Sequence, residues 1–386
     1  MPPSRSRRDV LRALGLVAAG APLAGCGTGL GPWSVGIGAR PTPPVPGSPA
    51  PPVAALPTEG AEIMAAPRAG QIQRIAAERP VIVPPRLPEG GVVGLVAPAG
   101  VLRGPDQLDE SVAALEGLGF RVRVGRAVLS RNGFLAGTDA ARARDFMAMV
   151  TDPEVDAVVG VRGGWGAARI LPLLNYDAIA AHPKPIVGYS DITSLLVAIY
   201  ARTGLVTFHG PVGVSTWQGL TSESFVRTLV EGEPPRLGPE TRSNRDRTQT
   251  VRPGIAEGPV VGGNLTVLSA LAGTGFLPDF DDHIVFFEEV GEDAYRIDRM
   301  LVQLQLAEAL REPAGIAFGQ CSSCGSGGSA WTAEETIRRH LAQYDCPSVL
   351  GAPIGHVSPV YTLPIGLRAR LDAEVGTLEY LREPVA

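Results

Sequence analysis

The chain of 386 residues is long enough for two domains, and its 45% hydrophobic and 19% charged residues are typical of a globular protein. The net charge of −5 gives no electrostatic reason to expect a nucleic-acid partner. Four cysteines are too few for a disulfide-rich scaffold. Composition therefore argues against both of these classes and leaves a protein of the size of an enzyme.

The first residues have the features of an export signal. Ser-Arg-Arg at 6–8 is similar to the twin-arginine motif, and the apolar run 13–25 is too short to span a bilayer. The run ends in Leu-Ala-Gly-Cys at 23–26, which is similar to the bacterial lipobox. We therefore predict a signal peptide over residues 1–26, export by the twin-arginine route and a lipid anchor on Cys26 at the outer face of the cytoplasmic membrane. The alternative is a buried N-terminal helix with an incidental cysteine.

Residues 27–88 are predicted to form a tether. The stretch 41–52 is rich in proline, which lacks an N–H group and fixes φ, so it cannot form a helix or a central strand. A semi-extended spacer of this kind can hold a domain away from a membrane surface.

Strands and helices alternate over residues 89–230. Unbroken apolar runs between glycines and prolines predict buried parallel strands, and periodic apolar residues predict helices. The alternation indicates an N-terminal α/β domain with a mostly parallel sheet flanked by helices. Arg142 and Arg144 are expected on the polar side of their helix. The predicted strands are 90–100, 121–124, 157–161 and 185–189, and the predicted helices are 108–118, 139–150 and 192–202.

A polar stretch, residues 231–258, interrupts this alternation and is predicted to be a connecting segment, with its residues 242–248 exposed. The remaining residues, 259–386, are predicted to form a C-terminal α/β domain. Its predicted elements are a strand at 284–287 and helices at 295–310 and 333–344.

Ser190 lies between a predicted strand and a predicted helix. A nucleophile at such a junction is exposed on a tight turn beside helix N–H groups, and the N–H of Asp191 would point to a developing oxyanion. Ile192 stands where the usual nucleophile turn has glycine. The alternative is that the Ser190 hydroxyl only caps the following helix.

A second turn, Arg162-Gly163-Gly164-Trp165-Gly166, also follows a predicted strand. Glycines let backbone N–H groups approach a ligand, so Gly163 and Gly164 are candidates for the other oxyanion donor. A dinucleotide-binding turn is the alternative, but Arg169 stands where its third glycine belongs.

Glu288 and Glu289 directly follow an apolar strand, and His356 lies in a loop rich in glycine and proline. With Ser190 they give the chain order Ser, Glu, His, which is one known order of a catalytic triad. His209 follows a strand and could line a pocket. The three other histidines, His182, His283 and His340, are expected to be exposed.

The cysteines of the C-terminal region, Cys321, Cys324 and Cys346, allow several interpretations. A zinc site would need a fourth ligand, for which His340 is only a loose candidate. The surroundings of the Cys-Ser-Ser-Cys sequence do not resemble a thioredoxin-like unit. We expect free thiols or one disulfide, and no metal.

Short motifs over residues 91–373 jointly resemble the LD-carboxypeptidase family of serine peptidases, which includes the microcin C immunity proteins. The resemblance implies an active site between two α/β domains, with Ser190 as nucleophile, Glu288 as acid and His356 as base, and with no cofactor. It also implies oxyanion donors at Asp191 and at Gly163-Gly164. Trp165 stands where tyrosine is common and is expected to alter the substrate pocket. The motifs are Val96-Ala97-Pro98, Gly133-Phe134-Leu135-Ala136-Gly137, Arg162-Gly163-Gly164-Trp165-Gly166, Gly188-Tyr189-Ser190-Asp191-Ile192-Thr193, His209-Gly210-Pro211, Gly262-Gly263-Asn264-Leu265, Phe287-Glu288-Glu289, Tyr295-Arg296-Ile297-Asp298-Arg299, Gly355-His356 and Leu363-Pro364-Ile365-Gly366.

The implied reaction removes the terminal D-Ala from a peptidoglycan stem tetrapeptide by hydrolysing its amide to the L-centre of diaminopimelate, through an acyl-enzyme. The export signal favours trimming of wall peptides outside the membrane, and a homodimer is left open. Two alternatives are an amidase of the microcin C immunity type, acting on an acyl-aspartyl-nucleotide, and a lipoprotein that binds wall peptides without cleaving them.

Overall fold

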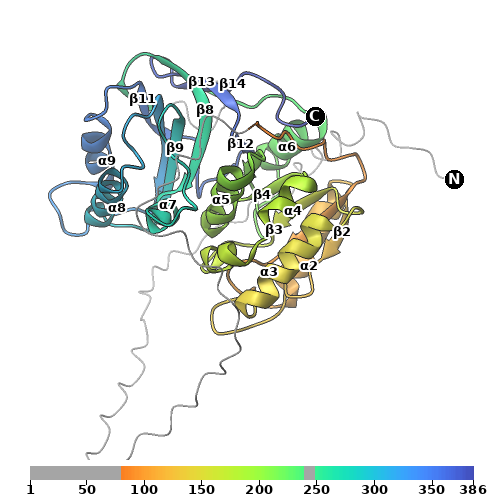
Figure 1. The fold of residues 1–386 in the computed structure, drawn as a ribbon. Helices are drawn as coiled ribbons and strands as arrows, with labels where there is room; N and C mark the ends of the chain where they lie inside the picture. Colours follow the sequence, from red (N-terminus) through yellow and green to blue (C-terminus); the bar gives the residue numbers. More distant parts are fainter. Residues whose placement is uncertain (1–79, 239–247) are drawn as a thin grey trace, which may run out of the picture. The chain divides into compact units, whose positions relative to one another are not determined.

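A computed structural model describes residues 80–238 and 248–386. The expected signal peptide with Cys26, the tether up to residue 79 and most of the polar stretch 242–248 lie outside the described residues. Within the described ranges, no helix is long and apolar enough to cross a membrane. The described chain forms two β-sheets, with α2 to α5 grouped around the first and α7 to α9 around the second (Figure 1).

The first sheet has the strand order β2-β1-β3-β4-β5-β12. The strands β1 to β5 pair in parallel, and only β12 is antiparallel to its neighbour. A 2-1-3-4-5 order is that of a doubly wound sheet, in which ligands bind beyond the carboxyl ends of the strands. The strands are β1 (Val92–Val96), β2 (Arg121–Val124), β3 (Ala157–Gly160), β4 (Ile186–Gly188), β5 (Thr207–His209) and β12 (Leu363–Ile365).

Helices connect the parallel strands of this sheet, as the alternation in the sequence predicts. Side-chain caps define several of their ends: the Thr138 hydroxyl accepts a hydrogen bond at the start of α3, and the Asn175 side chain does so at the start of α4. Gly204, in a left-handed conformation, ends α5. The helices are α2 (Pro105–Gly117), α3 (Asp139–Thr151), α4 (Tyr176–Ala181), α5 (Thr193–Thr203) and α6 (Leu220–Val226), with short helical segments η1 (Ala167–Leu173), η2 (Ser190–Ile192) and η3 (Arg227–Glu231).

The second sheet has the order β6-β14-β13-β8-β9-β10-β11-β7, with a parallel centre from β8 to β11 and antiparallel strands on both sides. Its strands are β6 (Arg236–Leu237), β7 (Gln249–Arg252), β8 (Ile255–Asn264), β9 (Ile284–Val290), β10 (Gly315–Ser322), β11 (Ser348–Ala352), β13 (Arg368–Asp372) and β14 (Thr377–Tyr380). Its helices are α7 (Leu265–Leu271), α8 (Ala294–Leu306) and α9 (Ala333–Leu341). The buried apolar residues of both sheets form one continuous cluster.

The structure differs from the expected organisation at three segments. Residues 80–88, predicted as the end of the tether, are part of the folded domain, because Ile82 forms a bridge with Leu205 and Leu87 is buried in the core. Residues 231–258, expected to be a connection, contain β6, β7 and the first part of β8. The apolar pattern of the sequence did not predict these strands, because β7 and the start of β8 bury at most one face and carry polar residues on the other. In addition, β12 leaves the C-terminal region and pairs with β5 of the first sheet.

Three polar residues expected at the surface are buried. Arg142 is 1% exposed, because its guanidinium donates to the carbonyls of Pro98 and Gly166 and pairs with Asp139. His283 and His340 are 8% and 6% exposed. A neighbouring polar partner, Tyr200 Oη for His283 and the Asp298 carboxylate for His340, compensates for the burial of each ring.

Candidate active site

Ser190 lies two residues after the short strand β4, at the carboxyl edge of the first sheet, where the helical segment η2 begins. It has φ of 61°, a left-handed conformation that a residue other than glycine rarely adopts. Backbone strain of this kind is common at functional sites, where the surrounding structure holds the residue in place. The turn therefore presents the Ser190 hydroxyl where a doubly wound sheet binds its ligands.

The glycine turn after β3 lies against this serine. A Cβ atom at Gly163 would lie 2.7 Å from Cβ and 2.8 Å from Oγ of Ser190, and 3.3 Å from the backbone nitrogen of Asp191. Only glycine permits this approach, so Gly163 and the Asp191 N–H lie beside the same hydroxyl. The structure thus brings Gly163 and Asp191, two of the residues predicted to supply oxyanion donors, together at Ser190.

The Asp191 side chain ties the two turns to each other. Its carboxylate is buried and accepts a hydrogen bond of 2.8 Å from the N–H of Ala167, at the end of the glycine turn. Burial raises the pKa of Asp191 to about 6, although this hydrogen bond and the charge of Arg142 oppose the shift. The buried Arg142 guanidinium also donates a hydrogen bond to the carbonyl of Gly166, so the end of the glycine turn that contacts Asp191 is itself fixed.

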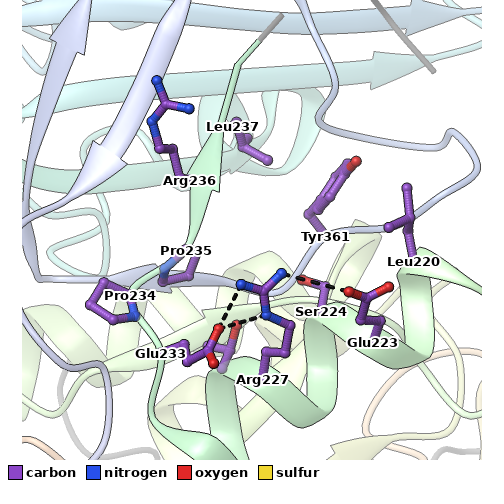
Figure 2. Close-up of a pocket in the computed structure, with 11 residues that line it drawn as sticks. Leu220, Glu223, Ser224, Arg227, Glu233, Pro234, Pro235, Arg236, Leu237 and Tyr361 are labelled. Carbon is purple, nitrogen blue, oxygen red and sulfur yellow. Dashed lines mark hydrogen bonds and ion pairs between the residues drawn. The ribbon is translucent and has the colours of Figure 1, made fainter. Parts of the chain in front are cut away.

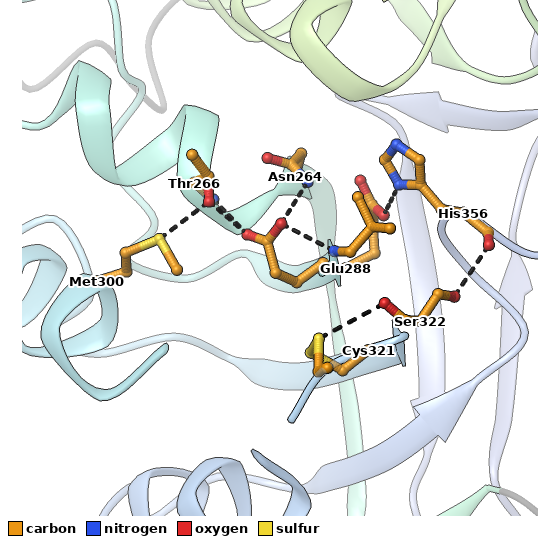
Figure 3. Close-up of a disulfide and its surroundings, with 10 residues drawn as sticks. Asn264, Thr266, Glu288, Met300, Cys321, Ser322 and His356 are labelled. Atoms are coloured by element: carbon orange, nitrogen blue, oxygen red, sulfur yellow. Dashed lines mark hydrogen bonds and ion pairs between the residues drawn. A yellow bond between two sulfur atoms is a disulfide. The ribbon is translucent and has the colours of Figure 1, made fainter. Parts of the chain in front are cut away.

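Glu288 and His356 come from the second sheet and from the loop after β11. Oε2 of Glu288 lies 2.7 Å from Nδ1 of His356, and the Glu288 side chain is 0% exposed (Figure 3). Gly355 has φ of 123°, and a Cβ there would lie 2.7 Å from Cβ of Glu288. A glycine before His356 is therefore needed for the loop to approach the carboxylate.

Alternation along β9 separates the two carboxylates. Glu289 accepts hydrogen bonds from Asn264 Nδ2 and from the backbone and hydroxyl of Thr266, on the face of the strand opposite to Glu288. Glu289 is thus a buried structural acid, and Glu288 is the one that meets the histidine.

The charge on Glu288 has a direct effect on His356. Burial tends to lower the pKa of His356, but the hydrogen bond and the charge of Glu288, with a smaller contribution from Glu289, outweigh burial and raise this pKa above its usual value. A carboxylate bonded to Nδ1 leaves Nε2 as the nitrogen that can accept a proton.

Ser190 and His356 line one small pocket of about 260 Å³, together with the glycine turn. The ring of Tyr189 contacts the His356 ring edge to face, with 4.9 Å between the centroids. No hydrogen bond joins Ser190 Oγ to His356 within the described residues. Such bonds are often loose without substrate, so the arrangement agrees with the predicted roles of Ser190, Glu288 and His356.

Models of two family regions match the chain: the LD-carboxypeptidase N-terminal domain at residues 93–210, and the LD-carboxypeptidase C-terminal domain at residues 257–371. A probable murein peptide carboxypeptidase of Bacillus subtilis is 37% identical over 75% of this chain and 91% of the relative. The chain belongs to the LD-carboxypeptidase family. It is therefore a serine hydrolase.

Solved structures of LD-carboxypeptidase relatives have the same two-domain fold. A muramoyltetrapeptide carboxypeptidase from Oxalobacter formigenes matches with a TM-score of 0.67 and 28% identity, covering 76% of this chain and all of that chain (100%). MccF, a microcin C7 self-immunity protein known from Escherichia coli, was solved in complex with glutamyl sulfamoyl guanosine. That structure matches with a TM-score of 0.73 and 25% identity, over 79% of this chain and 99% of that chain.

Two further residues of this LD-carboxypeptidase differ in position from what the sequence suggested. His209 is buried behind the pocket, against the rings of Tyr189 and Phe286, and burial lowers its pKa to about 4. Trp165 is 66% exposed and packs edge to face on Phe134 at the surface. The Trp165 side chain is thus outside the pocket at Ser190.

Cys321 and Cys324 form a disulfide at the end of β10 (Figure 3). Cys346 is free and buried. Between the two cysteines, the Ser322 hydroxyl donates a hydrogen bond of 2.9 Å to the backbone carbonyl of His356. Among the described residues, no group of three or more metal-ligating side chains could hold an ion.

A larger pocket of about 660 Å³ lies between α6 and residues 233–237 of this LD-carboxypeptidase (Figure 2). Arg227 within it is paired with Glu223 and Glu233. It shares no residue with the pocket at Ser190, so its size is not an argument that it is the catalytic site.

Proposed function

We propose that this protein is an exported, lipid-anchored LD-carboxypeptidase that removes the terminal D-Ala from peptidoglycan tetrapeptides. The observation that carries the proposal is the 2.7 Å contact between Glu288 Oε2 and His356 Nδ1. His356 lines the same pocket as Ser190, whose backbone is strained. The scissile bond is the amide between the L-centre of diaminopimelate and D-Ala.

In the first half-reaction, Nε2 of His356 takes the proton from Ser190 Oγ, and Oγ attacks the scissile carbonyl carbon. The N–H groups of Asp191 and of the Gly163-Gly164 turn stabilise the oxyanion. The imidazolium of His356, stabilised by Glu288, then donates its proton to the departing nitrogen of D-Ala. The C–N bond breaks and leaves the tripeptide acylated on Ser190.

The second half-reaction releases the tripeptide. A water molecule gives a proton to His356 and attacks the acyl carbon, and the proton returns to Ser190 Oγ as the ester bond breaks. Net hydrolysis consumes one water molecule, and no step of this scheme requires a metal ion.

Supporting the substrate assignment, the relatives include a probable murein peptide carboxypeptidase and a muramoyltetrapeptide carboxypeptidase. The test is mass spectrometry of a purified monomeric tetrapeptide muropeptide incubated with the protein, wild type beside Ser190→Ala. Loss of one D-Ala with the wild type alone is expected. An unchanged mass with folded wild-type protein would refute the substrate assignment.

The export signal and lipobox support the proposed location at the outer face of the cytoplasmic membrane. Growth with a lipid precursor that carries a label should label the wild type in the membrane fraction. Cys26→Ala should lose the label, and replacing the Arg7-Arg8 pair by lysines should block export. Labelled Cys26→Ala would contradict the anchor.

A second candidate is an amidase acting on an aminoacyl-nucleotide, favoured by the likeness to MccF in complex with glutamyl sulfamoyl guanosine. Turnover of an aminoacyl-sulfamoyl adenylate is compared with turnover of the muropeptide. A higher kcat/KM on the nucleotide conjugate would favour this candidate.

A further inference from the structure

The pocket at Ser190 carries positive charge without a matching acid. Arg103 and Arg162 are the cationic side chains among its lining residues, and none of those residues is Asp or Glu. Asp106, the acidic residue nearest to Arg103 in the chain, does not line the pocket. Neither arginine forms an ion pair with a described residue. The Glu288 carboxylate is 0% exposed and bonded to His356, so it does not neutralise the pocket surface.

Both arginines make hydrogen bonds to residues in the segment 101–107. Nη1 of Arg162 donates a hydrogen bond of 2.7 Å to the carbonyl of Val101, and Nε of Arg162 lies near Gly100 and Gly164. The backbone N–H of Arg103 donates to Oε1 of Gln107 at 2.9 Å. Arg162 is thus fixed beside the glycine turn, and Arg103 is fixed at its backbone while its side chain is exposed.

The proposed reaction places a negative group close to the carbonyl that Ser190 attacks. In an enzyme that removes one residue, the terminal carboxylate follows the scissile carbonyl carbon by only the nitrogen and one Cα, within about 5 Å. The anion therefore has to enter the same pocket as the carbonyl that Ser190 attacks. Guanidinium groups match a carboxylate in charge and in bidentate geometry.

We infer that Arg103 and Arg162 bind the free carboxylate of the departing residue and so restrict the enzyme to the ends of peptide chains. This inference rests on the proposed carboxypeptidase function and adds its substrate requirement. A peptide that continues past the scissile bond, or ends in an amide, presents no charge to the arginines and leaves them desolvated in the complex.

The closing experiment compares two synthetic tetrapeptides that differ only at the C-terminus, one with a D-Ala carboxylate and one with a D-Ala amide. Wild type should have a kcat/KM about 10- to 100-fold higher on the acid, the range for a lost hydrogen bond to a charged group. Arg103→Gln and Arg162→Gln should each reduce turnover of the acid towards that of the amide. Arg103→Lys should keep part of the preference for the acid, because lysine keeps the positive charge but cannot bind a carboxylate in a bidentate manner.

Arg144→Gln is the matched control, since it removes the same charge from an exposed position on α3, outside the pocket. This variant should keep the full preference for the acid. Arg162 also bonds the Val101 carbonyl, so Arg103→Gln, at an exposed side chain, carries the argument if Arg162→Gln unfolds.

Calorimetric binding of both peptides to Ser190→Ala separates this inference from the proposed function. If wild type cleaves neither peptide, the proposed function fails. A preference of Ser190→Ala for the acid that Arg103→Gln abolishes would still support the arginine site. Equal binding of acid and amide, or binding of neither, would overturn the inference.

Discussion

Ser190, Glu288 and His356 differ in what holds each side chain. Ser190 is fixed by its own left-handed backbone and by the glycine beside it. Glu288 is fixed by complete burial, and His356 by the Glu288 carboxylate at Nδ1 and the Tyr189 ring at its side. Ser190 is thus restrained independently of the other two side chains, whereas the orientation of His356 depends on Glu288.

Ser190→Ala and His356→Ala are expected to lower kcat by roughly 10³- to 10⁶-fold, since each removes a group that makes or breaks a bond. The urea midpoint should change little, because the Ser190 hydroxyl makes no internal hydrogen bond among the described residues. Steady-state kinetics and urea denaturation on the same preparations check both statements. Near-normal turnover of Ser190→Ala would refute the mechanism.

Glu288→Gln should reduce kcat by about 10²- to 10⁴-fold, because an amide no longer stabilises the imidazolium. Glu289→Gln is the matched control one residue away. It faces Asn264 and Thr266 instead of His356, so its kcat should stay within severalfold of wild type. Equal losses in both variants would contradict a special role for Glu288.

The pH dependence of kcat/KM should also report the interaction between Glu288 and His356. The base must be neutral, so kcat/KM rises as pH increases through the pKa of His356, which Glu288 holds above the usual value. Glu288→Gln removes the group that raises this pKa and leaves the burial that lowers it. The acid limb should therefore move to lower pH in the variant. A limb that stays in place, or moves to higher pH, would argue against this account.

At the scale of elements, the site depends on where strands end. The turns after β3 and β4 meet because these strands are parallel neighbours, with Val159 in register with Val187. The loop after β11 supplies His356, and β9 supplies Glu288. Two separate sheets thus provide the two halves of the site, each at the end of a parallel strand.

Gly163→Ala should lower kcat by about 10²- to 10³-fold, the range for a disturbed oxyanion donor, because the new Cβ would displace the Ser190 hydroxyl. Gly117→Ala, where no atom lies within 4 Å of the added Cβ, is the control and should leave kcat unchanged. Kinetics of both variants at saturating substrate make the comparison. Full activity of Gly163→Ala would show that the two turns are not in contact during catalysis.

The disulfide at the end of β10 should support the histidine loop. In the double variant Cys321→Ser, Cys324→Ser, the segment that carries Ser322 is less restrained, so kcat/KM should fall severalfold. Ser322→Ala, which removes the hydrogen bond to the His356 carbonyl, should have an effect of the same order. Kinetics in matched buffers test this, and unchanged activity in both variants would contradict it.

For the whole molecule, the continuous apolar core and the exchange of β12 into the first sheet connect the two domains. His209 on β5 and Phe286 on β9 also pack ring to ring across the sheets, with 5.2 Å between the centroids. The described part of the protein should therefore unfold as one unit.

Ile365→Ala on β12, at 0% exposure, should lower the free energy of unfolding by about 2–5 kcal/mol and keep a single transition. Leu306→Ala, at 81% exposure, is the control and should change it by less than about 0.5 kcal/mol. Far-UV circular dichroism and tryptophan fluorescence in urea should report coincident transitions. Separate transitions for the two signals would contradict a shared core.

Local sequence determined the class of the fold and the chemistry of the site. The apolar runs of β1, β3 and β4 are buried on both faces, so a short segment is enough to predict them. The glycines around Ser190 and His356 are likewise local requirements of tight turns. For this reason the motifs predicted both the parallel sheet and the residues of the candidate triad.

Only the tertiary structure decided what lies on the faces of these elements and which distant segments pair. The burial of Arg142, the pairing of β12 with β5 and the strands within residues 231–258 depend on partners far along the chain. The hydrogen bonds that direct Glu288 to His356 and Glu289 to Asn264, on opposite faces of one strand, also depend on such partners. Sequence periodicity reports whether a face is apolar, whereas long-range contacts determine what it meets.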